Sequence, residues 1–233
     1  MDNLKGKKVF FIGDSIMAAD GVVLNKELYP YMRYNLDKQG VTGRAYPTLL
    51  KEKLGIEILK NIAVGGSTVE HQKVRVMEND VTLADIFVIA LGVNDFSSSV
   101  PMGKIPEKYK DEHDETFIGR YCSILDYLYK NNPSAKIVLM TPLQKDTLTH
   151  KDVPDKSKKD AYSVNNEGLR LIDYRNAILE IGAFYSCVVC DMYAESGLNK
   201  YNIPLYTYEG THPTNEGYEF VIKPLIEAMR KLY

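Results

Sequence analysis

The chain has 233 residues, of which 45% are hydrophobic and 26% are charged, and its formal net charge is -2. This is the composition of an ordinary globular protein, and the near-neutral charge gives no sign of a nucleic-acid or membrane-surface partner. The length lies within the range that α/β proteins cover with one hydrophobic core, so we predict a single domain over residues 1–233.

The amino-terminal segment MDNLKGKKVFFIGDS carries basic residues ahead of its first apolar run. That run lasts only about four residues before Gly13-Asp14 interrupts it, which is too short for the core of a signal peptide. We therefore expect a cytoplasmic location for the chain as it stands, although a chain whose leader had been removed would look the same.

Short runs rich in β-branched residues recur along the chain and are separated by helix-like stretches. The predicted strands are KKVFFIG (7–13), IEILKNIA (56–63), DIFVIALG (85–92), AKIVLMTP (135–142) and AFYSCVVCD (183–191). The predicted helices span 47–54, 69–78, 116–130, 166–181 and 215–232. Apolar residues run together in these strands instead of alternating, which is typical of strands covered on both faces. The repeated strand–helix order predicts a doubly wound α/β domain with a parallel sheet.

Two connections, residues 17–45 and 143–165, are longer than this architecture requires. The second contains KDTLTHKDVPDKSKKD, which is either a solvated charged loop or a flap over a site. Because each connection begins at the carboxyl end of a predicted strand, we expect both to border a substrate pocket.

The three cysteines are Cys122, Cys187 and Cys190, an odd number that does not suggest a disulfide framework. Cys187 and Cys190 have the spacing of a redox motif, but they lie in a predicted strand, where residues three apart point to opposite faces. We therefore expect them to pack in the core. The sequence has no cluster of Cys and His residues of the kind that predicts a metal site.

Unusual polar residues follow three predicted strands, and a fourth group precedes the last helix. The groups are Gly13-Asp14-Ser15, Gly65-Gly66-Ser67, Gly92-Val93-Asn94-Asp95 and Glu209-Gly210-Thr211-His212-Pro213. Each alone has a structural explanation as a turn, a helix cap or a structural histidine. In an open parallel sheet, however, ligands bind beyond the carboxyl ends of the strands, so the groups are candidates for one site.

Together the four groups supply every part that acyl transfer by a serine needs. Ser15 offers a hydroxyl and a backbone N–H, and Gly66 offers an N–H that no side chain obstructs. Asn94 offers an amide donor, and His212 can take the serine proton. The pattern predicts a nucleophile, a base and donors for an oxyanion.

The four groups resemble the sequence blocks of the SGNH (GDSL-type) hydrolase family. The matching stretches are IGDSI, NIAVGGST, LGVNDF and EGTHPTNEGY, in the family's order, and they span residues 12–218. The resemblance implies a flavodoxin-like three-layer α/β/α sandwich with a five-stranded parallel sheet. It also implies that Ser15 is the nucleophile, that His212 is the base, and that Ser15, Gly66 and Asn94 form the oxyanion hole.

The chain departs from the family pattern three residues before the histidine, where relatives usually carry aspartate and this chain has Glu209. We expect Glu209 to orient His212, because Gly210 allows the turn to accommodate the longer side chain. The alternative is a Ser-His dyad oriented by a backbone carbonyl, with Glu209 a solvated surface acid. Asp14 is expected to hold the Ser15 turn through hydrogen bonds instead of acting as the catalytic acid.

The expected function is a serine esterase or deacylase that works through an acyl-enzyme, with no cofactor and no metal. Relatives act on lipids, thioesters, small aryl esters and acetylated sugars, and the favoured substrate is a carbohydrate O-acetyl ester. Tyrosines at 29, 31, 34, 201, 206 and 208 are either sugar-stacking groups or ordinary half-exposed aromatics.

The sequence leaves two alternatives open and disfavours a third. The first is a lysophospholipase- or thioesterase-type acyl hydrolase, and the second is a non-catalytic ligand-binding domain that retains the fold. A phosphate or nucleotide binder is disfavoured, because no P-loop or G-x-G-x-x-G follows the first strand. The expected partner is a small-molecule or carbohydrate ester, and the sequence makes no prediction of oligomeric state.

Overall fold

The computed structural model describes residues 3–23, 40–107, 114–146 and 160–233. Five parallel strands form one sheet in the order β2-β1-β3-β4-β5. The strands are β1 (Lys8–Gly13), β2 (Glu57–Asn61), β3 (Ile86–Ala90), β4 (Lys136–Met140) and β5 (Val188–Cys190). The predicted α/β fold with a five-stranded parallel sheet is therefore confirmed, in the strand order of flavodoxin-like folds.

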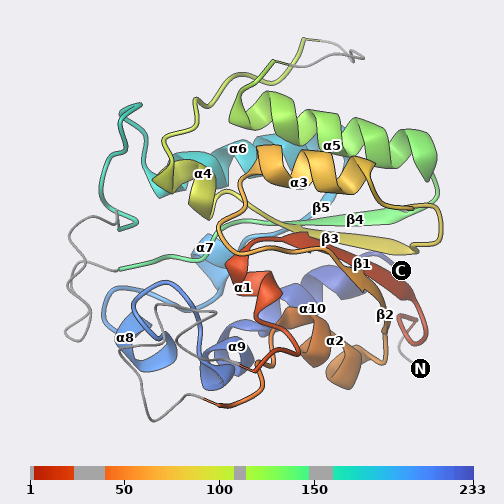
Figure 1. Ribbon diagram of the computed structural model, residues 1–233, viewed down its shortest axis with the longest axis horizontal. Coiled ribbons are helices and arrows are strands. Elements are labelled where there is room, and N and C mark those ends of the chain that lie inside the picture. Colours follow the sequence, from red (N-terminus) through yellow and green to blue (C-terminus); the bar gives the residue numbers. More distant parts are fainter. Residues whose placement is uncertain (1–2, 24–39, 108–113, 147–159) are drawn as a thin grey trace.

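Helices cover both faces of the sheet (Figure 1). One layer contains α3 (Val69–Met77), α5 (Phe117–Asn131) and α6 (Leu171–Tyr185), and the other contains α2 (Tyr46–Leu54), α9 (Asn215–Val221) and α10 (Lys223–Arg230). Successive β1 residues point to opposite layers: Phe10 packs with the first, and Val9 and Phe11 pack with the second. The four short helices α1 (Ser15–Ala18), α4 (Val93–Ser97), α7 (Met192–Glu195) and α8 (Ile203–Tyr206) lie near the carboxyl ends of the strands.

The expectation that both faces of every strand are covered holds for the central strands but is wrong for β2. Glu57, Lys60 and Asn61 are exposed there, because β2 is an edge strand that pairs only with β1. Charged residues on an edge strand also oppose pairing with another chain.

The predicted helix 166–181 begins five residues too early, since α6 spans Leu171–Tyr185. The Asn165 side chain accepts hydrogen bonds from the N–H groups of Glu167 and Leu169, each at 3.0 Å, and so holds a turn where a helix was predicted. At its other end the helix continues to Tyr185 and is closed by Ser186 with φ of 55°. The fifth strand is correspondingly shorter than predicted, at Val188–Cys190.

The predicted helix 215–232 is two helices, α9 and α10, with the break at Ile222. Pro224 has no N–H to donate to the preceding turn, so it ends one helix and is favoured at the start of the next.

The cysteines pack as predicted and are free. Cys122 and Cys187 pack in the α3–α5–α6 layer, whereas Cys190 is buried in the opposite layer. Burial raises the pKa of the Cys122 and Cys187 thiols to about 11, so both are protonated at neutral pH.

The two long connections are described only at their ends, because residues 24–39 and 147–159 lie outside the described residues. Where the second connection is described, Ala161 N–H donates to the Lys145 carbonyl at 3.0 Å, and Asp146 N–H donates to the Gly210 carbonyl at 2.9 Å. The end at Asp146 therefore reaches the turn that carries His212, and the end at Ala161 pairs with the residue before Asp146. The prediction that the connections border the pocket stays a prediction. Within the described ranges, no helix has the length and apolar character needed to cross a bilayer.

Candidate active site

The first predicted group lies where the strand order reverses between β1 and its neighbour β3. Gly13 ends β1, and a Cβ at this position would lie 2.7 Å from Met17 Cβ, so the close packing of α1 on the strand requires glycine. The next residue, Asp14, is buried and caps α1, its Oδ1 accepting from Ile16 N–H at 3.0 Å. Asp14 thus holds the turn that presents Ser15, as predicted, and burial raises the pKa of its carboxyl to about 6.

Ser15 and His212 are 197 positions apart in the sequence, and Ser15 Oγ lies 2.8 Å from His212 Nε2. Ser15 is the first residue of α1, where it is partly exposed. His212 lies in a turn closed by the bridge between Thr207 and Pro213, and its carbonyl accepts from Tyr208 N–H at 2.9 Å. The nucleophile and base predicted from the sequence are therefore within hydrogen-bond distance.

The other ring nitrogen of His212, Nδ1, hydrogen-bonds Glu209 Oε1. Glu209 is completely buried, so it is not a solvated surface acid. Gly210 has φ of 90°, which is favourable for glycine alone, and Glu209 Oε1 also accepts from His212 N–H at 3.3 Å. A ring whose Nδ1–H donates to this carboxylate has Nε2 available to accept the proton of Ser15.

The second predicted group forms a tight turn beside Ser15. Ser67 N–H donates to the Val64 carbonyl at 3.2 Å, and Gly66 has φ of 76°, a value that strongly favours glycine at this turn position. A Cβ built on Gly65 would lie 3.8 Å from Ser15 Cβ, so the turn runs next to the serine. Gly66 itself is exposed, and open space surrounds the position that its Cβ would occupy.

Asn94 lies in α4, which follows β3 after Gly92. Its Nδ2 donates to the Ser67 carbonyl at 3.0 Å, so one amide hydrogen is used to hold the glycine turn. Because the amide group is planar, this hydrogen bond also fixes the direction in which the second hydrogen on Nδ2 points. The structure therefore brings the serine, the glycine turn, the asparagine and the histidine to one end of the sheet.

Two buried charged residues at this end were given no role of their own by the sequence, which named Asp95 only as a member of the third polar group and Lys145 only as the start of a charged run. Asp95 is fully buried and accepts hydrogen bonds from Val69 N–H. Lys145 is 4% exposed and its Nζ donates to Ser97 Oγ at 2.9 Å. The position of Asp95 after a strand end was the signal that pointed to it, whereas Lys145 begins the run that was predicted to be either a solvated charged loop or a flap over a site.

The tyrosines proposed to stack on sugars do not form one set. Tyr208 is buried, and Tyr206 stacks on Phe220 with ring centroids 4.0 Å apart, so neither is a free platform. Tyr201 is 81% exposed. Residues 29, 31 and 34 lie outside the described residues.

Among the described residues, no group of three or more His, Cys, Asp or Glu side chains is placed so that it could hold a metal ion.

Comparisons with known proteins agree with the geometry. Residues 11–220 match the model of the GDSL-like lipase/acylhydrolase family. No curated protein sequence matches significantly.

Several solved structures share the fold over nearly the whole chain. A protein described as a possible lipase from Chitinophaga pinensis is 24% identical, with a TM-score of 0.72, and the match covers 97% of this chain and 98% of that chain. A Lactobacillus plantarum protein is 21% identical, with a TM-score of 0.73 and coverage of 98% and 99%. A catalytic mutant of Axe2, an acetylxylan esterase from Geobacillus stearothermophilus, is 19% identical, with a TM-score of 0.62 and coverage of 98% and 96%. The chain therefore belongs to the GDSL-like lipase/acylhydrolase (SGNH) family, whose members are hydrolases that act on ester bonds.

Proposed function

We propose that the protein is a serine esterase or deacylase in which Ser15, His212 and Glu209 form the catalytic triad. The observation that carries the proposal is the continuous hydrogen-bonded chain from Ser15 Oγ through both ring nitrogens of His212 to the buried Glu209 carboxylate. In a serine hydrolase this arrangement activates the hydroxyl and stabilises the imidazolium that forms.

In the first half of the proposed reaction, Ser15 Oγ bonds to the ester carbonyl carbon while its proton passes to His212 Nε2. The carbonyl oxygen becomes an oxyanion, which accepts hydrogen bonds from Ser15 N–H, Gly66 N–H and the Asn94 amide. Collapse of this intermediate breaks the bond to the alcohol, which leaves with the proton from His212. A water molecule then cleaves the acyl-enzyme by the same steps, with His212 again as base.

The favoured substrate class is a carbohydrate O-acetyl ester. The observation that supports it is the likeness to an acetylxylan esterase across nearly the whole chain. The second candidate is a lysophospholipase- or thioesterase-type activity. It is less favoured, because the sequence has no large apolar stretch suited to a long acyl chain.

An ester panel tests the activity and the substrate class together. We expect turnover of p-nitrophenyl acetate to exceed that of butyrate and longer esters, and we expect acetate release from acetylated xylan or oligosaccharides. A preference for long acyl chains would replace the carbohydrate assignment with the lipase-type one, and turnover of no ester would favour a binding domain.

The role of Ser15 is tested with a serine-directed organophosphonate. We expect the wild-type protein to be labelled at Ser15 and Ser15→Ala to lose both labelling and turnover, because no other group replaces the attacking oxygen. Ser67→Ala is the matched control, since Ser67 lies in the adjacent turn but is only 4% exposed. Labelling that persists in Ser15→Ala and disappears in Ser67→Ala would reverse the assignment.

A further inference from the structure

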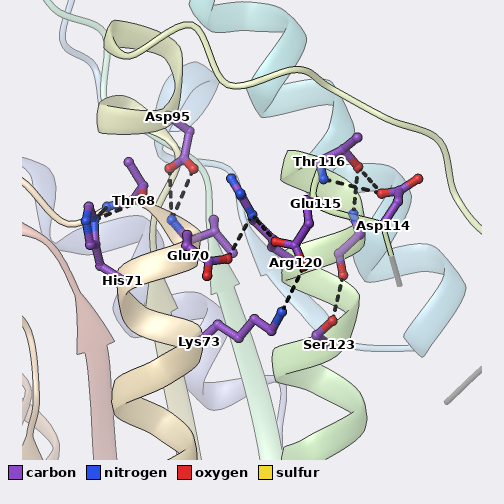
Figure 2. A network of polar contacts seen from close by, with 12 residues as sticks. Thr68, Glu70, His71, Lys73, Asp95, Asp114, Glu115, Thr116, Arg120 and Ser123 are labelled. Carbon is purple, nitrogen blue, oxygen red and sulfur yellow. Dashed lines mark hydrogen bonds and ion pairs between the residues drawn. The ribbon is translucent and has the colours of Figure 1, made fainter. Parts of the chain in front are cut away.

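Two consecutive residues of α4 bind the segment that joins the glycine turn to α3. Asn94 Nδ2 donates to the Ser67 carbonyl at 3.0 Å. The carboxylate of the next residue, Asp95, accepts from Val69 N–H, with Oδ1 at 3.1 Å and Oδ2 at 3.3 Å. Figure 2 shows the Asp95 carboxylate aimed at the start of α3, with both of its oxygens turned toward this helix.

The Asp95–Val69 contact is a strong one for physical reasons. Val69 is the first residue of α3, so its N–H has no acceptor within the helix, and a carboxylate there also interacts favourably with the helix dipole. Asp95 is completely buried, which strengthens the hydrogen bonds by excluding water. A side chain without exposed surface acts on the reaction only through its neighbours.

Two other polar contacts at this end of α3 involve Thr68 and Arg120, and neither reaches α4. Thr68 caps the helix locally, its N–H donating to His71 Nδ1 at 3.2 Å. Arg120 of α5 pairs with Glu70 in the first turn of α3, with Nε and Oε2 2.8 Å apart (Figure 2). Among these contacts, the bonds from Asn94 and Asp95 are the ones that fix the start of α3 against α4.

We propose that Asp95 is a positioning residue that holds the start of α3 against α4 and thereby sets the Gly66 N–H in register with the Asn94 amide. The inference rests on the proposed function, because it concerns the oxyanion hole of that reaction. Only Ser67 and Thr68 separate Gly66 from Val69, so movement of Val69 moves the donor of Gly66. Oxyanion stabilisation depends on donor geometry, and displacement of one donor weakens it.

The acceptor function does not require a charge. Burial raises the pKa of Asp95 to about 7, with the nearby Asp14 also raising it and Arg120 and the Val69 N–H lowering it. A protonated carboxyl and an amide both retain a carbonyl oxygen that accepts from Val69 N–H. Asp95→Asn is therefore the conservative variant that restores the contact.

The experiment compares Asp95→Ala and Asp95→Asn with Asn132→Ala, using p-nitrophenyl acetate. Asn132 is a suitable control because it is 6% exposed and donates to the carbonyls of Val81 and Ala84, each at 2.9 Å, at the opposite end of the sheet. We expect both alanine variants to lose stability but only Asp95→Ala to lose kcat, by about tenfold or more, toward the 10²–10³ typical of one lost oxyanion donor. KM should change little, and Asp95→Asn should recover most of kcat.

A double-mutant comparison tests whether Asp95 acts through the oxyanion hole. The kcat loss in Asn94→Ala/Asp95→Ala should be clearly smaller than the product of the two single losses, because both disturb one geometry. Each of three results would overturn the inference. The kcat losses of the two single variants could multiply fully in the double variant, Asp95→Ala could keep the same kcat as Asn132→Ala, or the effect of Asp95→Ala could be confined to KM. If Asp95→Ala does not fold, Asp95→Glu moves the carboxylate outward by one methylene and should also lower kcat; wild-type kcat in that variant would overturn the inference.

Failure of this inference is distinguishable from failure of the proposed function. If Ser15→Ala is inactive while Asp95→Ala behaves like the Asn132 control, the positioning role is wrong and the serine mechanism stands. If Ser15→Ala keeps wild-type turnover, the mechanism itself fails, and the positioning role fails with it.

Discussion

The buried acid beside the histidine carries one more methylene than the aspartate that relatives usually have. Glu209 nevertheless reaches His212 Nδ1 from three residues away, because Gly210 adopts a φ of 90° and turns the backbone back on itself. A side chain other than glycine is strained in that conformation. The longer acid and the glycine that follows it are therefore a compatible pair.

Glu209→Gln should lower kcat by about tenfold or more with KM nearly unchanged, since the lost interaction is the one that strengthens as charge develops on His212. The measurement is a steady-state comparison on an activated ester across pH. Glu216→Gln, an exposed acid on the neighbouring helix, serves as the control for a simple loss of charge. Near wild-type kcat in Glu209→Gln would make the enzyme a Ser-His dyad.

At the scale of elements, α9 fixes the turn that carries His212. Thr214 caps this helix, its N–H donates to the Tyr206 carbonyl at 2.9 Å, and its Oγ1 accepts from Gly217 N–H at 3.1 Å. The backbones come so close here that a Cβ on Gly217 would lie 2.0 Å from the Tyr206 oxygen. The histidine turn is therefore held between α8 and α9 by contacts that leave no room for a side chain.

Gly217→Ala should lower both stability and activity, although alanine favours the helix more than glycine does. The added methyl group meets backbone and not a movable side chain, and overpacking of this kind costs about 1–3 kcal/mol. Urea denaturation measures the loss, and kcat reports the displacement of His212. An unchanged urea denaturation midpoint together with an unchanged kcat would mean that α9 moves away from α8 with no loss of stability.

At the scale of the whole molecule, two buried carboxyl groups make stability depend on pH. Burial raises the pKa of Asp14 from 3.8 to about 6 and that of Asp95 from 3.8 to about 7. The folded state therefore binds more protons than the unfolded state between about pH 4 and pH 7. The stability contributed by the protonated carboxyls is complete below about pH 4 and is lost as pH rises through 6 and 7.

Asp95→Asn removes one of these titrations, so its stability relative to wild type should increase with pH from 4 to 7, by about 1–3 kcal/mol. Urea denaturation of both proteins at a series of pH values measures the difference, and other titrating groups largely cancel in it. A difference that stays constant across this range would show that Asp95 has an ordinary pKa in the folded protein.

The sequence predicted the fold and the residues of the candidate site because both depend on local patterns. Continuous apolar runs identified the strands, and polar groups at their ends identified the residues that the sheet brings together. The same patterns failed at two places for different reasons. The Asn165 side chain accepts from the N–H groups of Glu167 and Leu169 and holds a local turn where the pattern predicted the start of a helix. The edge position of β2 leaves part of a strand exposed that the pattern predicted to be covered on both faces.

Only the tertiary structure decided how the supporting residues are buried and paired. The sequence predicted that Glu209 orients His212, and the structure shows Glu209 completely buried against that ring. Asp95 accepts from Val69, 26 positions away, because segments far apart in sequence pack there and exclude water. A buried polar group needs a partner, and that partner is set by packing, not by its neighbours in sequence. The sequence by itself therefore predicted the candidate reacting groups and Glu209, whereas packing alone made Asp95 the buried acceptor at the start of α3.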